Sequence, residues 1–144
     1  MSRRLNALIG GLLTFVWAVS SVAGELRVSV DGVKNNFGNV RVSLYRSPDG
    51  FATKAGRFME TVVSARLGVN EAVFSDVPEG IYGLAAFHDE NDNVEFDRNF
   101  IGFPQEGFGF GNDAPVFLGP PNFSETTVTV NDEIKRVSLT LRYW

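Results

Sequence analysis

Apolar and polar residues alternate with a period of two along most of this 144-residue chain. The pattern is clearest in segments 26–30, 40–44, 128–130 and 137–143. Successive side chains of a β-strand point to opposite faces of the sheet, so this alternation predicts strands that bury one face. No segment has a convincing helical period of roughly 3.6 residues. The chain is therefore predicted to be all-β.

Three more segments, 61–67, 72–77 and 81–87, are also predicted strands. Segment 81–87 is apolar on both faces, which is typical of a strand at the centre of a sheet. Turn signals such as Ser-Pro-Asp-Gly at 47–50 separate the strands. Together they predict a single prealbumin-like or immunoglobulin-like β-sandwich of about seven strands.

Two predictions concern the connections between these strands. A short helix is predicted within residues 51–60. Asn131-Asp132 predicts a hairpin turn, which would join the last two strands as neighbours in one sheet.

The N-terminus predicts a cleavable signal peptide over residues 1–23, with a positive start, an apolar run and small residues before the cleavage site. These features are Arg3 and Arg4, residues 5–19, and Ser21 and Ala23. An uncleaved membrane anchor is the alternative, since the run approaches the roughly 20 residues that span a bilayer. Cleavage would leave residues 24–144 as one domain, exported to the periplasm or the extracellular space and not bound to the membrane.

Charge and cysteine content narrow the classes of function. The predicted leader holds two of the 13 basic residues and none of the 17 acidic ones, so the remainder has a net charge of −6. An acidic domain without a basic cluster argues against binding to nucleic acid or anionic membranes. The chain has no cysteine, which excludes disulfides, thiolate metal sites and thiol nucleophiles.

Segment 98–123 interrupts the alternation and is rich in glycine, proline and phenylalanine. Its phenylalanines are Phe100, Phe103, Phe108, Phe110, Phe117 and Phe123. Long irregular segments inside a domain are usually functional or mobile, and burying each ring is worth about 2–3 kcal/mol. The rings are predicted either to plug one end of the sandwich or to form an exposed surface for a protein or carbohydrate partner.

Residues 89–97 place a side-chain oxygen at every second position, and calcium prefers oxygen ligands. The five candidate ligands are Asp89, Asn91, Asn93, Glu95 (through its backbone carbonyl) and Asp97. The loop matches the first positions of an EF-hand loop, but Phe100 stands where the bidentate glutamate belongs. Glu90, Glu106 or Asp113 would have to supply that ligand. The alternative is a metal-free loop in which Asp and Asn bond to the backbone.

Four strings of the chain resemble known β-domains. Residues 77–82, Val-Pro-Glu-Gly-Ile-Tyr, resemble the Pro-x-Gly-x-Tyr turn of prealbumin-like and carboxypeptidase-regulatory-like β-sandwiches. Residues 87–97, 101–110 and 119–123 are together similar to a family of small exported bacterial proteins, domain of unknown function 2141. The resemblance implies an exported prealbumin-like β-sandwich and no particular reaction. Val94 departs from the glycine that relatives usually carry after the second asparagine.

His88 is the sole histidine and precedes Asp89. A hydrolase would use the two as a base and its orienting carboxylate, but no Gly-x-Ser-x-Gly nucleophile motif is present. The more favoured role is a hydrogen-bonded residue that shapes the loop. The leading functional prediction is a non-enzymatic exported binding or structural module with calcium as its stabilising ion. The alternatives are a carbohydrate-binding module that uses the phenylalanines and, less favoured, a hydrolase.

Overall fold

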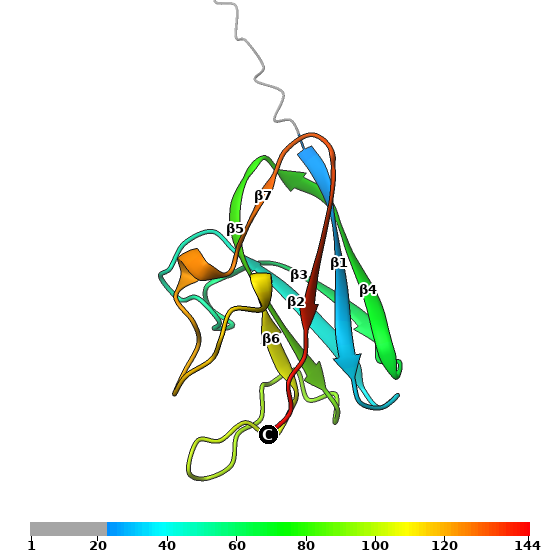
Figure 1. Ribbon diagram of the computed structural model, residues 1–144, viewed down its shortest axis with the longest axis vertical. Coiled ribbons are helices and arrows are strands. Elements are labelled where there is room, and N and C mark those ends of the chain that lie inside the picture. The colour runs from blue at the N-terminus through cyan, green and yellow to red at the C-terminus, as the bar shows by residue number, and fades with distance from the viewer. Residues whose placement is uncertain (1–22) are drawn as a thin grey trace, which may run out of the picture.

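The computed structural model describes residues 23–144, which form two stacked β-sheets (Figure 1). The strands are β1 (Ala23–Val33), β2 (Asn39–Tyr45), β3 (Arg57–Ser64), β4 (Gly68–Pro78), β5 (Gly80–Asp89), β6 (Phe108–Phe110), β7 (Thr127–Val130) and β8 (Ile134–Thr140). Two short 3₁₀ turns are η1 (Gly111–Asp113) and η2 (Phe123–Glu125). The predicted signal peptide lies outside the described residues, except for Ala23 at the start of β1.

One sheet has three strands in the order β4-β1-β8, and the other has the order β3-β2-β5-β6, with β7 also paired to β5. All pairs are antiparallel except β1 with β8, which run parallel with Val28 opposite Val137. The predicted all-β sandwich is therefore confirmed, with eight strands among the described residues instead of about seven. The prediction that 81–87 forms a central strand is also confirmed, because β5 pairs with β2, β6 and β7.

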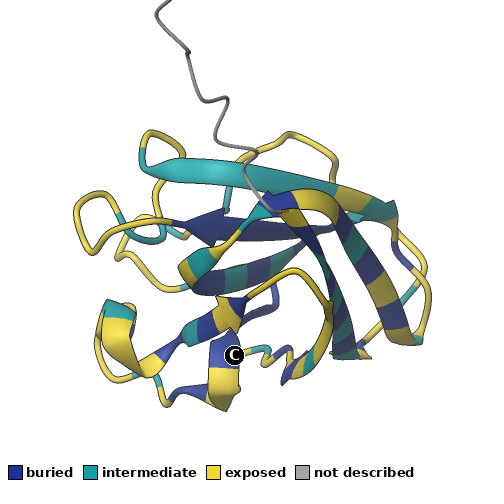
Figure 2. Cartoon of the chain, turned by 90° about the horizontal axis from the view of Figure 1, so that it is seen from above, coloured by how far each residue is buried: buried dark blue, intermediate teal, exposed yellow. Residues whose placement is uncertain are grey.

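The core lies between the two sheets, and its residues are those at alternate positions of the strands. Figure 2 shows this as bands of buried and less buried residues along the strands. Leu26, Val28 and Val30 of β1 are completely buried. Tyr82 of the Pro-x-Gly-x-Tyr motif also enters the core, and its hydroxyl donates a hydrogen bond to the Pro78 carbonyl at 2.6 Å. In β1, alternation thus decides which face is buried, whereas β2 is buried on both faces.

Two predicted connections are wrong. Residues 51–56 form turns, and β3 begins at Arg57, so the predicted helix within 51–60 is absent. Gly50 and Ala52 have positive φ angles, which an α-helix does not accommodate. Asn131-Asp132 does not form a hairpin between neighbouring strands, because β7 pairs with β5 and β8 pairs with β1 in the other sheet. The chain crosses between the layers at this point.

Segment 98–123 runs over the outer face of the five-stranded sheet and contains β6 and η1. In Figure 1 this segment lies beside the sheet that holds β5 and β6. Within residues 23–144, no helix has the length and apolar character required to span a bilayer. The segment matters for function because it forms one wall of a large pocket.

Candidate functional site

A pocket of about 640 Å³ lies on the outer face of the five-stranded sheet. Its floor includes Ser43 of β2 and Ala85 of β5, which stand opposite each other across the two strands. Both side chains are small, so the middle of this face is not filled by its own residues. Ligand pockets in proteins commonly measure about 300–1,000 Å³, and this volume falls within that range.

Aromatic rings on the same face surround the small floor residues. Phe108 and Phe110 of β6 are buried there, with Phe110 opposite Ala85 and Phe108 opposite Phe87. Phe96 packs edge-to-face against both Phe87 and Phe108, with ring centroids 5.6 Å apart in each pair. Edge-to-face pairs of this kind stabilise a fixed arrangement of rings. The pocket therefore has a firm aromatic base.

The rim of the pocket is apolar and exposed. Phe103, Phe117 and Leu118 line it, with 52%, 87% and 95% of their surfaces accessible. Trp144 also lines the pocket and stacks on Phe108 with an interplanar angle of 8°. These side chains form an exposed apolar patch beside an unfilled hollow, which is typical of a surface that contacts a ligand or partner.

The phenylalanines of segment 98–123 divide between the two predicted roles. Phe108 and Phe110 are buried and cover the sheet, as a plug would. Phe103 lines the open rim, whereas Phe100 is 99% exposed but is not part of the pocket lining. Phe123 is half-buried and packs edge-to-face on Phe51. The segment is therefore both a cover for the sheet and an exposed surface.

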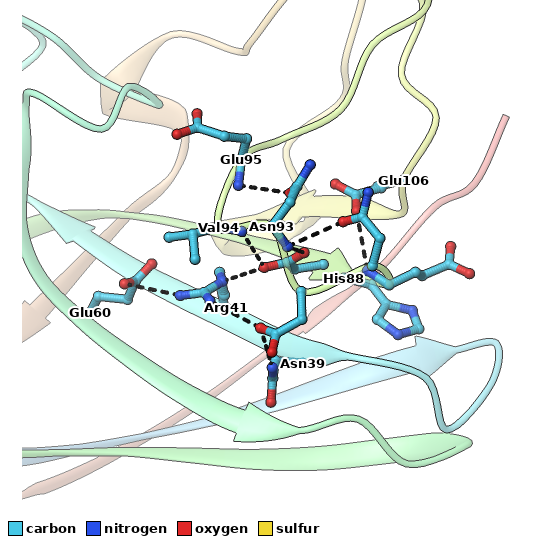
Figure 3. A network of polar contacts seen from close by, with 12 residues as sticks. Asn39, Arg41, Glu60, His88, Asn93, Val94, Glu95 and Glu106 are labelled. Carbon is cyan, nitrogen blue, oxygen red and sulfur yellow. Dashed lines mark hydrogen bonds and ion pairs between the residues drawn. The ribbon is translucent and has the colours of Figure 1, made fainter.

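The predicted calcium loop begins with the completely buried carboxylate of Asp89. Figure 3 shows the network of polar contacts to which Arg41, Asn93 and Val94 belong. Asp89 Oδ2 accepts hydrogen bonds from Arg41 Nε at 2.7 Å and from the Val94 amide at 3.0 Å. Its Oδ1 accepts a hydrogen bond from the Asn93 amide at 3.0 Å. Asp89 is thus engaged by an arginine and two backbone amides, and it anchors the loop to β2.

The outer part of the loop brings three predicted ligands together. The side-chain amides of Asn91 and Asn93 donate hydrogen bonds to the Asp97 carboxylate at 2.7–3.0 Å. The Glu95 side chain pairs with Lys54 at 3.1 Å, which leaves its predicted contact through the backbone carbonyl untested. The other four predicted ligands are divided between an inner anchor, Asp89, and an outer cluster of Asn91, Asn93 and Asp97. Within residues 23–144, no group of three or more His, Asp or Glu side chains is placed to hold a metal ion.

Glu106 closes the two ends of the loop. It is buried, and its carboxylate accepts hydrogen bonds from the backbone amides of Glu90 and Asp97, each at 3.1 Å. Burial raises the pKa of Glu106, although these hydrogen bonds act in the opposite direction. Glu106 does reach the loop from segment 98–123, but its contacts hold the loop backbone.

The sequence does not predict that Arg41 is the side chain that pairs with Asp89. Arg41 occupies an alternate polar position of β2, a position that predicts ordinary solvent exposure. It is instead buried, with Glu60 and Asp92 each 3.5 Å away in addition to Asp89. The register of β2 against β5 brings this arginine close to Asp89, and no single segment of sequence contains that information. The sequence likewise does not predict Trp144 as a pocket residue, because its contact with Phe108 joins two segments that are far apart in the chain.

His88 and Asp89 point to opposite faces of β5, so they do not form a base and its orienting carboxylate. His88 is completely buried in the core, with Nε2 2.6 Å from the Phe37 carbonyl and Nδ1 2.8 Å from the Tyr143 hydroxyl. Because a carbonyl can only accept, Nε2 carries a proton and donates it to the Phe37 carbonyl. His88 therefore ties the chain before β2 to the C-terminal segment.

Comparison with known proteins identifies a family. The model of the family described as "Uncharacterized protein conserved in bacteria (DUF2141)" matches residues 28–138. No curated protein and no solved structure matches the chain significantly. The match covers most of the described residues, including most of both sheets, the acidic loop and all of the pocket lining except Trp144.

Proposed function

Because the chain belongs to the bacterial family DUF2141, whose members are uncharacterised, we propose a function from the geometry: an exported, non-enzymatic module that binds a small apolar ligand. The observation that carries the proposal is the pocket of about 640 Å³ with its aromatic base and exposed apolar rim. A largely apolar hollow with a few polar groups is the usual form of a small-molecule site.

The exposed rim supports binding over a purely structural plug. A plug would direct its rings inward, as Phe108 and Phe110 do. Phe117 and Leu118 are instead almost fully accessible beside the hollow. Burying such a side chain is worth about 2–3 kcal/mol, so an occupant that covers both would gain substantially.

Carbohydrate is the alternative occupant, with Phe103 and Phe117 as stacking platforms. Sugar hydroxyls require several hydrogen-bonding groups around the ring, whereas polar side chains are a minority of this pocket lining. Its charged side chains are Lys54, Arg57, Glu95 and Arg98, and Lys54 is already paired with Glu95. The lining therefore favours an apolar ligand.

Export and the finer type of the fold belong to the same proposal. Export rests on the charge and apolar pattern of residues 1–23. A prealbumin-like or immunoglobulin-like type is supported by the hydrogen bond from the Tyr82 hydroxyl back to Pro78, which resembles the tyrosine corner of such sandwiches.

Calcium binding by residues 89–97 stays a prediction, and we propose a narrower ligand set for it. Asn91, Asn93 and Asp97 lie together at the exposed outer part of the loop, whereas Asp89 is engaged by Arg41. Both asparagine side chains direct their nitrogens at the Asp97 carboxylate, so calcium binding would require them to turn their oxygens toward the ion. With one carboxylate in the cluster, the site would be weak, at a dissociation constant of about 10⁻⁴ to 10⁻³ M. Calcium would stabilise the wall of the pocket.

The binding proposal is tested with a neutral naphthylamine dye, whose fluorescence rises in apolar surroundings. We expect saturable binding to the wild-type protein and a loss of roughly tenfold or more in affinity for Ala85→Leu, which fills the floor. Ser138→Leu adds the same side chain at an exposed position of β8 and is the matched control. Equal binding to all three proteins would contradict the proposal.

A further inference from the structure

The charges around the pocket are opposite in sign to those of the whole protein. The chain carries 13 basic and 17 acidic residues. Three basic side chains, Lys54, Arg57 and Arg98, line the pocket, whereas Glu95 is its sole acidic residue among the described ones. The positive excess is therefore local, and it surrounds an otherwise apolar hollow. A site of this composition favours a ligand that has an apolar body and a negative charge.

Arg57 is the basic pocket residue that has a buried donor without a hydrogen-bond partner among residues 23–144. It is the first residue of β3, lies opposite Tyr45 of β2, and has a side chain that is 17% exposed. Its Nη1 lies 2.8 Å from Glu60 Oε1, but its buried Nε has no hydrogen-bond partner within residues 23–144. A buried donor without a partner costs free energy, and a charged one costs more than a neutral one. A ligand acceptor would remove this cost.

The other two basic residues have different roles. Lys54 is engaged by Glu95 at 3.1 Å. Arg98 lies over the Phe96 ring at 5.1 Å and donates a hydrogen bond to the Gly102 carbonyl at 3.3 Å. Both hold the walls of the pocket together while contributing positive charge. Tyr45 also lines the pocket, and burial raises the pKa of its hydroxyl, which therefore remains a protonated donor at neutral pH.

We infer that the pocket takes an amphiphile with a carboxylate head group, whose apolar part lies on the phenylalanine rings and whose carboxylate accepts a hydrogen bond from Arg57 Nε. This inference rests on the proposed function, because it names the class of ligand for the same pocket. A carboxylate matches arginine well, since guanidinium and carboxylate form short, charge-assisted hydrogen bonds. The rings supply affinity, and Arg57 selects the head group.

The test compares three probes with the same chain and different heads: dodecanoate, dodecanol and dodecylammonium. Each is titrated below its aggregation concentration at slightly alkaline pH. Trp144 is the readout, because it lines the pocket and the other tryptophan of the chain, Trp17, belongs to the predicted leader. We expect dodecanoate to bind about tenfold more tightly than dodecanol, and dodecylammonium to bind most weakly.

The variant Arg57→Gln should bind dodecanoate no more tightly than dodecanol. Arg136→Gln removes the same charge from an exposed position of β8 and should leave the preference intact. A preference for dodecanoate that survives in Arg57→Gln would overturn the assignment to Arg57.

The wild-type series decides the ligand class without any variant. Equal affinities for dodecanoate and dodecanol would overturn the inference and leave the apolar binding site standing. Failure of all three probes to change Trp144 fluorescence or to bind by calorimetry would overturn the proposed function as well.

Discussion

Arg41 Nε lies 2.7 Å from Asp89 Oδ2, and this ion pair is buried beneath the acidic loop. The remaining bonds of Asp89 go to the amides of Asn93 and Val94, so one carboxylate fixes both the strand and the turn. Val94 and Glu95 in turn line the pocket. The acidic loop that Asp89 holds therefore also supplies part of the pocket lining.

Removing the Asp89 carboxylate should strongly destabilise the protein. We expect Asp89→Ala to lower the free energy of unfolding by about 3–5 kcal/mol, because it leaves Arg41 buried without its closest partner. Asp92→Ala removes a more exposed carboxylate 3.5 Å from the same arginine, and we expect it to cost less than about 1 kcal/mol. Urea denaturation measures both. Similar losses for the two variants would contradict the anchoring role of Asp89.

Val94 has a φ of +67°, in the left-handed region that favours glycine. A β-branched residue there is strained by about 1–2 kcal/mol. Val94→Gly should therefore raise the free energy of unfolding by about 1 kcal/mol, after the greater freedom of glycine in the unfolded chain is allowed for. Val94→Ala keeps a side chain at the strained position and is the control. A loss of stability in the glycine variant would show that the packing of Val94 outweighs its strain.

Glu90 should make stability depend on acidic pH. Partial burial opposes its ionisation, but hydrogen bonds from Lys34 and Asn35 and the charge of Lys34 outweigh burial and lower the pKa of Glu90. A lowered folded-state pKa contributes stability above the unfolded value of about 4.3, and this contribution is lost as the pH falls through the folded value.

We therefore expect wild type to exceed Glu90→Gln in stability at pH 7, by less than about 1 kcal/mol because the pair is partly exposed. The difference should shrink as the pH is lowered below about 4. Denaturation curves at several pH values measure it. A difference that is constant from neutral to acidic pH would contradict the role given to ionised Glu90.

Calcium should raise the melting temperature through the outer part of the acidic loop. We expect several millimolar calcium to raise the melting temperature of wild type by a few degrees relative to chelator, since calcium binds the folded loop better than the unfolded one. Asp97→Ala should lose this response, whereas Asp49→Ala, in the exposed 47–50 turn, should keep it. Identical wild-type melting curves with and without calcium would refute the site.

Most of the strands could be predicted from sequence because each is encoded by its own alternation, but β6 lies in segment 98–123, where no alternation predicts a strand. Leu26, Val28 and Val30 specify the buried face of β1 without reference to other segments. The partner of β8 could not be predicted in this way. β8 pairs in parallel with β1, a strand about one hundred residues earlier, while the local Asn131-Asp132 signal predicted a hairpin with β7. Asn131-Asp132 therefore predicts where the chain bends, but it does not predict which sheet the next strand joins.

The site was only partly visible in the sequence. The concentration of phenylalanines located its walls, and the oxygen-rich loop located one side of it. The pocket itself depends on Ser43 and Ala85 meeting across β2 and β5, and on Phe110 pairing with Ala85 from β6. Small residues in a strand predict nothing by themselves. Only the register of the strands turns them into the floor of a hollow.

The most direct test of the account is a map of backbone amide chemical shifts in isotope-labelled protein titrated with dodecanoate. We expect shifts concentrated in the pocket, at Ala85, Gly102, Phe117 and Trp144, with a response from the Arg57 Nε–H. The outer surface of the β4-β1-β8 sheet should be unaffected. Shifts centred on that sheet, or no saturable shifts at all, would contradict the claim that the five-stranded sheet carries the binding site.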